Sequence, residues 1–161
     1  MSKIPHSQTR RNARMGAVQA LYQMDLGGAV SGAVIDEFKE HRFDEGAADE
    51  VFFQEIVEGV VAFQDDIDKT ISEHLSERWS LKRLDMTLRA IMRTGAFEIM
   101  RRPDVPALVV IDEYVSIAAA FFDDKQPAFV NGALEKIAKK VRAAEFGLIG
   151  GTGAISAETN E

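Results

Sequence analysis

The sequence contains no cysteine, so no disulfide framework stabilises the chain. No uninterrupted apolar run approaches the roughly 18 residues that a membrane-spanning helix requires. The first residues, MSKIPHSQTRR, carry charges but have no apolar core of a signal peptide behind them. These absences predict a cytoplasmic protein with no membrane partner.

Residue types that serve catalysis or metal binding are scarce or badly spaced. His6, His41 and His74 lie far apart without the paired spacing of zinc ligands. The acidic stretch DDIDKTISEHLSE lacks the glycine and the ligand spacing of a calcium loop and predicts the solvated side of a helix. GLIGGTG, near the end, has no strand before it and no Lys-Ser or Lys-Thr after it. We therefore expect no enzyme, no cofactor and no metal ion.

Apolar residues repeat at three and four along most of the 161 residues, which is the spacing of helices with one buried face. The first expected helix is capped by Ser7 or Thr9 and ends at Gly27-Gly28, and a weaker helix follows over 32–41. A long helix is marked by apolar residues from Phe53 to Leu75, and the next is capped by Ser80 and ends at RRPDVP. The last two helices begin near Pro106 and at Pro127. Gly59 lies inside the long helix, where glycine costs about 1 kcal/mol relative to alanine, so another helix is expected to approach it closely. No convincing strand remains, and the predicted fold class is all-α, with a helical domain over 1–146 and a flexible glycine-rich tail over 147–161.

The net charge of −7 is unevenly distributed along the chain. Residues 1–24 carry four bases and no acid, residues 25–77 carry fifteen acids against three bases, and residues 78–102 carry seven bases against two acids. Arg11, Arg14 and Tyr22 fall on one flank of the first helix, because each residue advances the helix by about 100°. Cations oppose the positive N-terminal end of a helix dipole, so helix stability does not explain these arginines. An anionic partner that binds one face of the protein explains why these arginines are there.

Three stretches then match one family in the right order: RRNARMGAVQALYQMDL, RAIMRTGAFEIMRRPDVPALVVIDEYVSIAAAF and FVNGALEKIAKKVR. They resemble the NusB transcription antitermination factors, which typically show arginines before an Ala-x-Gln-Ala-Leu-Tyr run, an Asp-Val-Pro turn and a Phe-Val-Asn-Gly-x-Leu signature. Ala107 and Leu108 depart from the basic or polar residues of many relatives, and Lys125 lies near the position of an acid in some of them. The tail after Arg142 has no family counterpart.

The resemblance implies a compact bundle of about seven helices in two packed halves. It also implies binding to boxA, a short single-stranded RNA element in the leaders of ribosomal RNA transcripts, together with the ribosomal protein NusE. The complex helps RNA polymerase resist premature termination, without a catalytic step. A homodimer is one alternative state of the protein in the absence of RNA.

The charge pattern and the resemblance together predict these RNA-binding residues: Arg10, Arg11, Arg14, Gln19, Tyr22, Arg89, Phe129 and Asn131. Arginine contacts phosphates and stacks on unpaired bases, and aromatic rings stack on them as well. Burial in the core is the alternative for Tyr22 and Phe129. Arg83, Arg89 and Arg93 either extend the RNA surface or pair with internal acids such as Asp85 and Glu98. Of these we expect Arg89 to face RNA and Arg93 to be structural.

Two other functions compete with antitermination. The same fold occurs as the RNA-binding domain of some ribosomal RNA cytosine methyltransferases, whose longer chains carry a cofactor-binding domain. This sequence shows no glycine fingerprint of such a domain. The second alternative is a non-catalytic helical protein that assembles through an apolar face.

Overall fold

The helices of the protein follow the periodicity of its sequence closely. The computed structural model describes residues 4–76 and 78–148, so the predicted tail lies outside the described residues from residue 149 onward. The seven α-helices of the described residues are α1 (His6–Gly27), α2 (Ser31–Glu37), α3 (Glu50–Ala62), α4 (Gln64–Glu73), α5 (Met86–Arg101), α6 (Ala107–Phe121) and α7 (Lys125–Val141). A π-helical turn over Phe38–Arg42 extends α2, and short 3₁₀ turns cover Leu81–Arg83 and Ala143–Phe146. The same residues contain no strand, which confirms the all-α prediction.

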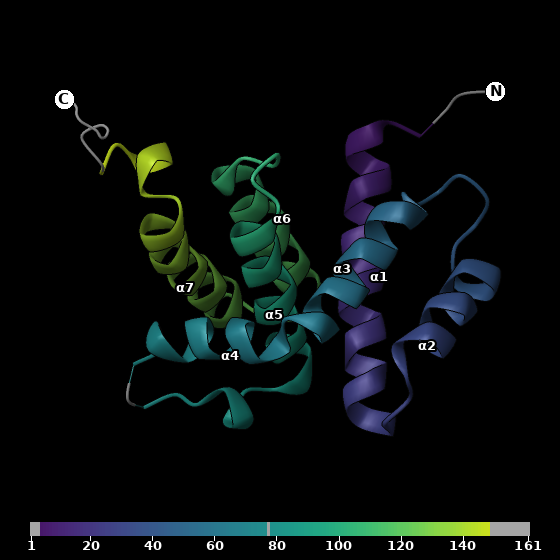
Figure 1. Ribbon diagram of the computed structural model, residues 1–161, viewed down its shortest axis with the longest axis horizontal. Helices are drawn as coiled ribbons and strands as arrows, with labels where there is room; N and C mark the ends of the chain where they lie inside the picture. The colour runs from purple at the N-terminus through teal and green to yellow at the C-terminus, as the bar shows by residue number, and fades with distance from the viewer. Residues whose placement is uncertain (1–3, 77, 149–161) are drawn as a thin grey trace.

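The helices form two packed halves that meet along α5 (Figure 1). In the first half α1, α2 and α3 pack against one another, and in the second α4, α6 and α7 surround α5. Both α1 and α3 also pack on α5 and so join the halves. The predicted arrangement in two halves is therefore confirmed.

The start of α1 differs from the prediction, whereas its end agrees with it. The helix begins at His6 after Pro5, and Thr9 lies inside the first turn, where its hydroxyl donates to the His6 carbonyl. Proline suits this boundary because its φ is fixed near the helical value and it has no N–H to satisfy. At the other end Gly28 adopts φ 71° and donates its N–H to the Met24 carbonyl, as a glycine helix stop does.

Two other predicted boundaries are wrong. Phe63, with φ −112° and ψ 21°, breaks the long helix into α3 and α4, and Val60 before the break and Ile67 after it are both buried in the core. Ser80 does not cap α5. Asp85 caps it, because its Oδ1 accepts hydrogen bonds from two backbone N–H groups of the first turn.

Other sequence predictions agree with the structure. Pro106 directly precedes α6, and Pro127 lies in the first turn of α7, two residues after the helix begins. A Cβ added to Gly59 would lie 2.2 Å from the Phe97 ring. The close approach of a second helix at Gly59 is thus confirmed, and that helix is α5.

Candidate nucleic-acid interface

Arg11 lies on the surface near the start of α1, as predicted, but it already holds an anion. Its Nε and Nη2 donate to the two carboxylate oxygens of Glu113 in α6, at 3.1 and 2.9 Å. The side chain of Arg11 remains 48% exposed. The hydrogen bonds and the charge of Glu113 raise the pKa of Arg11. An RNA phosphate that binds Arg11 therefore competes with this carboxylate.

Arg10 is half-buried beside Arg11 and is held by an aromatic ring. Its guanidinium carbon lies 4.1 Å from the centre of the Phe52 ring, which is a cation–π contact. The nearest carboxylate oxygen is that of Asp49, 3.5 Å from Nε. Asp49 caps α3, so Arg10 links the starts of α1 and α3.

Arg14 is a correction to the predicted surface site, because its side chain is only 4% exposed. Its Nε and Nη2 donate to the carboxylate of Glu98 in α5, at 2.7 and 2.9 Å, and the hydroxyl of Tyr114 donates to the same carboxylate. Burial alone opposes the charge of Arg14, but the hydrogen bonds and charge of Glu98 raise its pKa overall. Burial and the charge of Glu98 raise the pKa of Tyr114, which keeps its hydroxyl protonated. Arg14 is thus a buried link between the two halves, with no free face for RNA.

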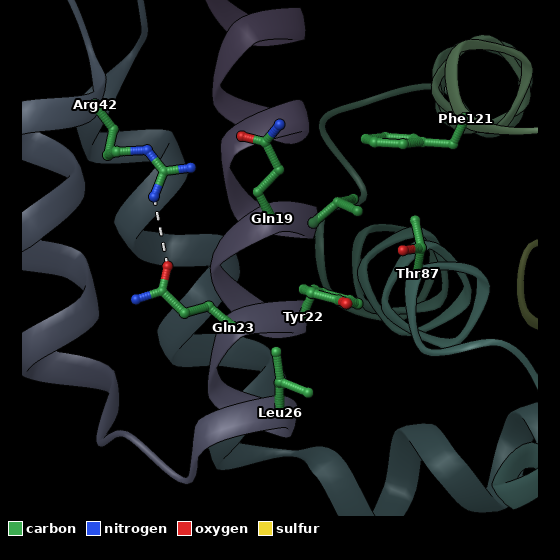
Figure 2. Close-up of a pocket in the computed structure, with 8 residues that line it drawn as sticks. Gln19, Tyr22, Gln23, Leu26, Arg42, Thr87 and Phe121 are labelled. Carbon is green, nitrogen blue, oxygen red and sulfur yellow. Dashed lines mark hydrogen bonds between the residues drawn. The ribbon is translucent and has the colours of Figure 1, made fainter.

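Gln19 and Tyr22 line an open groove farther along α1. The groove has a volume of about 410 Å³, and its walls are Val18, Gln19, Tyr22, Gln23, Leu26, Arg42, Thr87 and Phe121. Figure 2 shows the α1 side chains on one side and Thr87 and Phe121 on the other, with Arg42 donating to Gln23. Tyr22 is 37% exposed, so its ring is not enclosed in the core. Arg42, Thr87 and Phe121 were not predicted from the sequence, since they come from elements that no local pattern connects to α1.

Arg89 and Arg93 are both paired with acids and mostly buried, whereas different roles were expected of them. Arg89 pairs with Asp25 at 2.6 Å and donates to the carbonyls of Leu81 and Lys82. Arg93 pairs with Asp68 at 2.9 Å and also approaches Asp25. Both side chains are mostly buried. Both arginines thus pair with internal acids, which was the predicted alternative to RNA contact. The acids are Asp25 and Asp68, and not the predicted Asp85 and Glu98.

Phe129 and Asn131 lie on α7, away from the groove on α1. Phe129 is half-buried against Trp79, with the two ring centres 5.4 Å apart, and Asn131 is exposed. The two rings border a hollow of about 220 Å³ whose lining residues are His74, Leu75, Ser76, Trp79, Ala128, Phe129, Gly132, Ala133 and Lys136. The hollow shares no lining residue with the groove. Trp79 was missed because a single aromatic residue in a polar connector produces no periodic pattern.

Ion pairs neutralise most of the arginines on which the prediction relied. Among residues 4–76 and 78–148, a carboxylate lies within 4.0 Å of Arg10, Arg11, Arg14, Arg89, Arg93, Arg101, Arg102 and Arg142. Within the same residues no such carboxylate is found for Arg78, Lys82 and Arg83, which are exposed in the connector between α4 and α5, or for Lys136 on α7. Among the described residues the same holds for Lys39, Arg42, Lys69, Lys125 and Lys140. The cations left for an external anion therefore lie near Trp79 and also elsewhere, including Arg42 in the groove.

In the part of the chain that the structure describes, none of the helices combines the length and the apolar character needed to cross a membrane. Nor do three or more His, Asp or Glu side chains of that part gather in a way that suits a metal ion.

Comparison with known proteins assigns the family. The sequence model of the NusB family matches residues 11–139. The chain is similar to transcription antitermination protein NusB of Maricaulis maris, with 50% identity over 87% of this chain and 92% of the relative. It is also similar to the protein of that name from Caulobacter vibrioides, with 53% identity over 84% and 95% of the two chains. The chain therefore belongs to the NusB family.

Solved structures agree with this assignment. NusB of T. maritima has a TM-score of 0.76 at 28% identity, over 91% of this chain and all of the other (100%). A crystal structure of the antitermination factors NusB and NusE in complex with dsRNA matches with a TM-score of 0.72 at 28% identity, over 81% of this chain and 96% of the other.

Proposed function

We propose that this protein is a cytoplasmic transcription antitermination factor that binds boxA RNA of ribosomal RNA transcripts together with NusE. The complex helps RNA polymerase resist termination, and the protein performs no catalytic step. The observation that carries the proposal is its similarity to two relatives named transcription antitermination protein NusB, at 50% and 53% identity over 92% and 95% of their length. A similar fold in a NusB–NusE–dsRNA structure supports the two partners.

The proposed RNA face combines several of the predicted residues. Arg10 and Arg11 supply charge at the start of α1, and Gln19 and Tyr22 supply a hydrogen-bonding amide and an aromatic ring along the groove. The guanidinium of Arg89 is available to a phosphate that displaces Asp25. Phe129 and Asn131 add an aromatic ring and an exposed amide on α7. Arg14 is left out of this face, because its role is to hold α1 against α5 through Glu98.

The proposal is tested by titrating a labelled boxA oligonucleotide with the protein, with and without NusE, at several salt concentrations. We expect weak binding by the protein alone and tighter binding with NusE, because few cations of α1 are free of internal carboxylates. Single-stranded RNA releases about 0.7 counterions for each phosphate contact, so the affinity should fall as salt increases. A scrambled oligonucleotide is the control. Equal affinity for both RNAs, or a salt slope near zero, contradicts the proposal.

Gel filtration of the same samples separates the competing functions. The antitermination factor forms a ternary complex with RNA and NusE. The RNA-binding domain of a methyltransferase would bind RNA with no effect of NusE, and an assembly protein would elute as an oligomer that RNA leaves unchanged. The elution volume without RNA also tests the homodimer.

A further inference from the structure

We propose that the hollow between Trp79 and Phe129 binds one unpaired nucleobase of the RNA, with Trp79 as its stacking surface. This inference rests on the proposed RNA-binding function and adds a base site on the α4–α5 connector and α7. Three features of the hollow support it: an aromatic pair in which Trp79 is exposed, a helical glycine with open space at its Cβ position, and nearby cations for which no described residue supplies a carboxylate within 4.0 Å.

The aromatic pair is placed for stacking. Trp79 is the single tryptophan of the sequence, and it is 51% exposed. Its ring centre lies 5.4 Å from that of half-buried Phe129, with an angle of 46° between the planes. The Phe129 ring thus packs against Trp79, and about half of the Trp79 surface remains open to solvent. Single-stranded RNA is typically bound by stacking its bases on such rings.

Gly132 supplies the second feature, on the α7 side of the hollow. Glycine inside a helix is about 0.5–1 kcal/mol less stable than alanine, so its presence calls for a reason. At Gly59 and Gly95 the reason is steric, because an added Cβ would lie within 3 Å of a neighbouring side chain. At Gly132 an added Cβ would meet no atom within 4 Å, and the residue lines the hollow. Gly132 therefore leaves the α7 side of the hollow open, so that a base can approach the backbone of the helix there.

The charges around the hollow suit a nucleic acid. Lys136 is one of the lining residues, and none of the residues that line the hollow is acidic. Arg78, Lys82 and Arg83 are close to Trp79 in sequence and exposed, and no described residue offers any of them a carboxylate within 4.0 Å. Lys136 is therefore available to a phosphate beside a stacked base, and Arg78 adjoins Trp79 along the chain.

The single tryptophan allows a direct test. A boxA oligonucleotide is titrated into the full-length protein while the emission of Trp79 is followed, and the affinity is measured separately with a labelled oligonucleotide. We expect the RNA to quench Trp79. Stacking is worth about 1–3 kcal/mol per base, so Trp79→Ala should weaken binding roughly 5- to 140-fold and Trp79→Phe should retain most of the affinity. Leu108→Ala, another exposed apolar residue, is the matched control and should bind as the wild type does.

Gly132→Ala provides a readout that a purely structural role would not produce. The substitution should raise the thermal stability of the protein and at the same time weaken RNA binding, because its methyl group occupies part of the hollow. Gly32→Ala is the control, since Gly32 also has no atom within 4 Å of an added Cβ but lies in α2. It should leave RNA binding unchanged.

The outcomes distinguish this inference from the proposed function. If RNA binds the wild type while Trp79 emission stays constant and both variants retain full affinity, the base site is refuted and the proposed function stands. If no RNA binds the wild type, with or without NusE, the proposed function fails and the base site fails with it. If NusE alone quenches Trp79 and Trp79→Ala weakens NusE binding but not RNA binding, the hollow is a protein contact and the inference is overturned.

Discussion

Replacing Arg14 with alanine should destabilise the fold far more than replacing Arg11, although both arginines lie in the first turns of α1. Arg14 is buried and donates two hydrogen bonds to Glu98, which also accepts the hydroxyl of Tyr114. Removing Arg14 leaves the carboxylate of Glu98, whose side chain is fully buried, without its counter-charge. It also removes the ionic contact between α1 and α5.

The size of the effect follows from this burial. Removing one partner of a buried ion pair typically costs about 3–5 kcal/mol, because the other charge stays in the interior. For a domain of 150–250 residues each kcal/mol lowers the melting temperature by roughly 2–4 °C, so Arg14→Ala should melt roughly 6–20 °C below the wild type. Arg11 pairs with Glu113 at the surface, and its loss should cost about 1 kcal/mol or less.

Urea denaturation followed by circular dichroism measures both variants. The double variant Arg14→Met/Glu98→Gln serves as a further control, because replacing a buried pair by uncharged side chains of similar size is often nearly neutral. It should recover a large part of the stability lost in Arg14→Ala. If Arg14→Ala unfolds at the same urea concentration as Arg11→Ala, the buried pair does not support the fold.

Three other perturbations are predicted. Gly59→Ala should lose about 1–3 kcal/mol of unfolding free energy in urea, because the new methyl group collides with the Phe97 ring, and an unchanged midpoint would mean that the ring moves away freely. Hydrogen bonds from Arg102 lower the pKa of Asp104 from 3.8 to about 2. This carboxylate therefore stabilises the fold above about pH 4, and its contribution is lost as the pH falls towards 2. Asp104→Asn should be less stable than the wild type by at most about 1 kcal/mol at pH 6, since the pair is exposed. The difference should shrink as the pH falls through about 2, and a difference at pH 2 as large as that at pH 6 would contradict the assignment. Tyr22→Ala should lose more RNA affinity than stability, whereas Tyr22→Phe should retain most of both, and normal RNA binding by an unstable alanine variant would remove Tyr22 from the RNA face.

Local periodicity predicts the helices well, and helix ends less well. The apolar spacing of α5, α6 and α7 is a property of each segment alone, so it is visible without the fold. The break at Phe63 cannot be seen in the sequence, because Phe63 continues the apolar spacing of α3. Only the packing of α4 on α5 shows that the chain turns there. Likewise, both Ser80 and Asp85 are good capping residues, and the choice between them depends on where the connector meets the core.

The charged residues of the candidate site depend on partners that are distant in sequence. Arg14 and Arg11 come from the same helix turn, yet one meets Glu98 in the core and the other Glu113 at the surface. No spacing within α1 distinguishes them. Trp79 and Phe129 are similarly separated along the chain, and only the packing of the connector against α7 brings their rings together.

The central position of α5 has a consequence for chain cleavage. A cut in the connector around residues 74–80 would divide the protein into a fragment with α1 to α4 and a fragment with α5 to α7. The first fragment would expose the faces of α1, α3 and α4 that pack on α5, and the second would expose the opposite face of α5 itself. Neither fragment keeps a closed core, so each should be poorly folded alone. Mixed together, they should reassociate and recover helicity, because association buries the apolar faces of α1, α3 and α4 against α5 again.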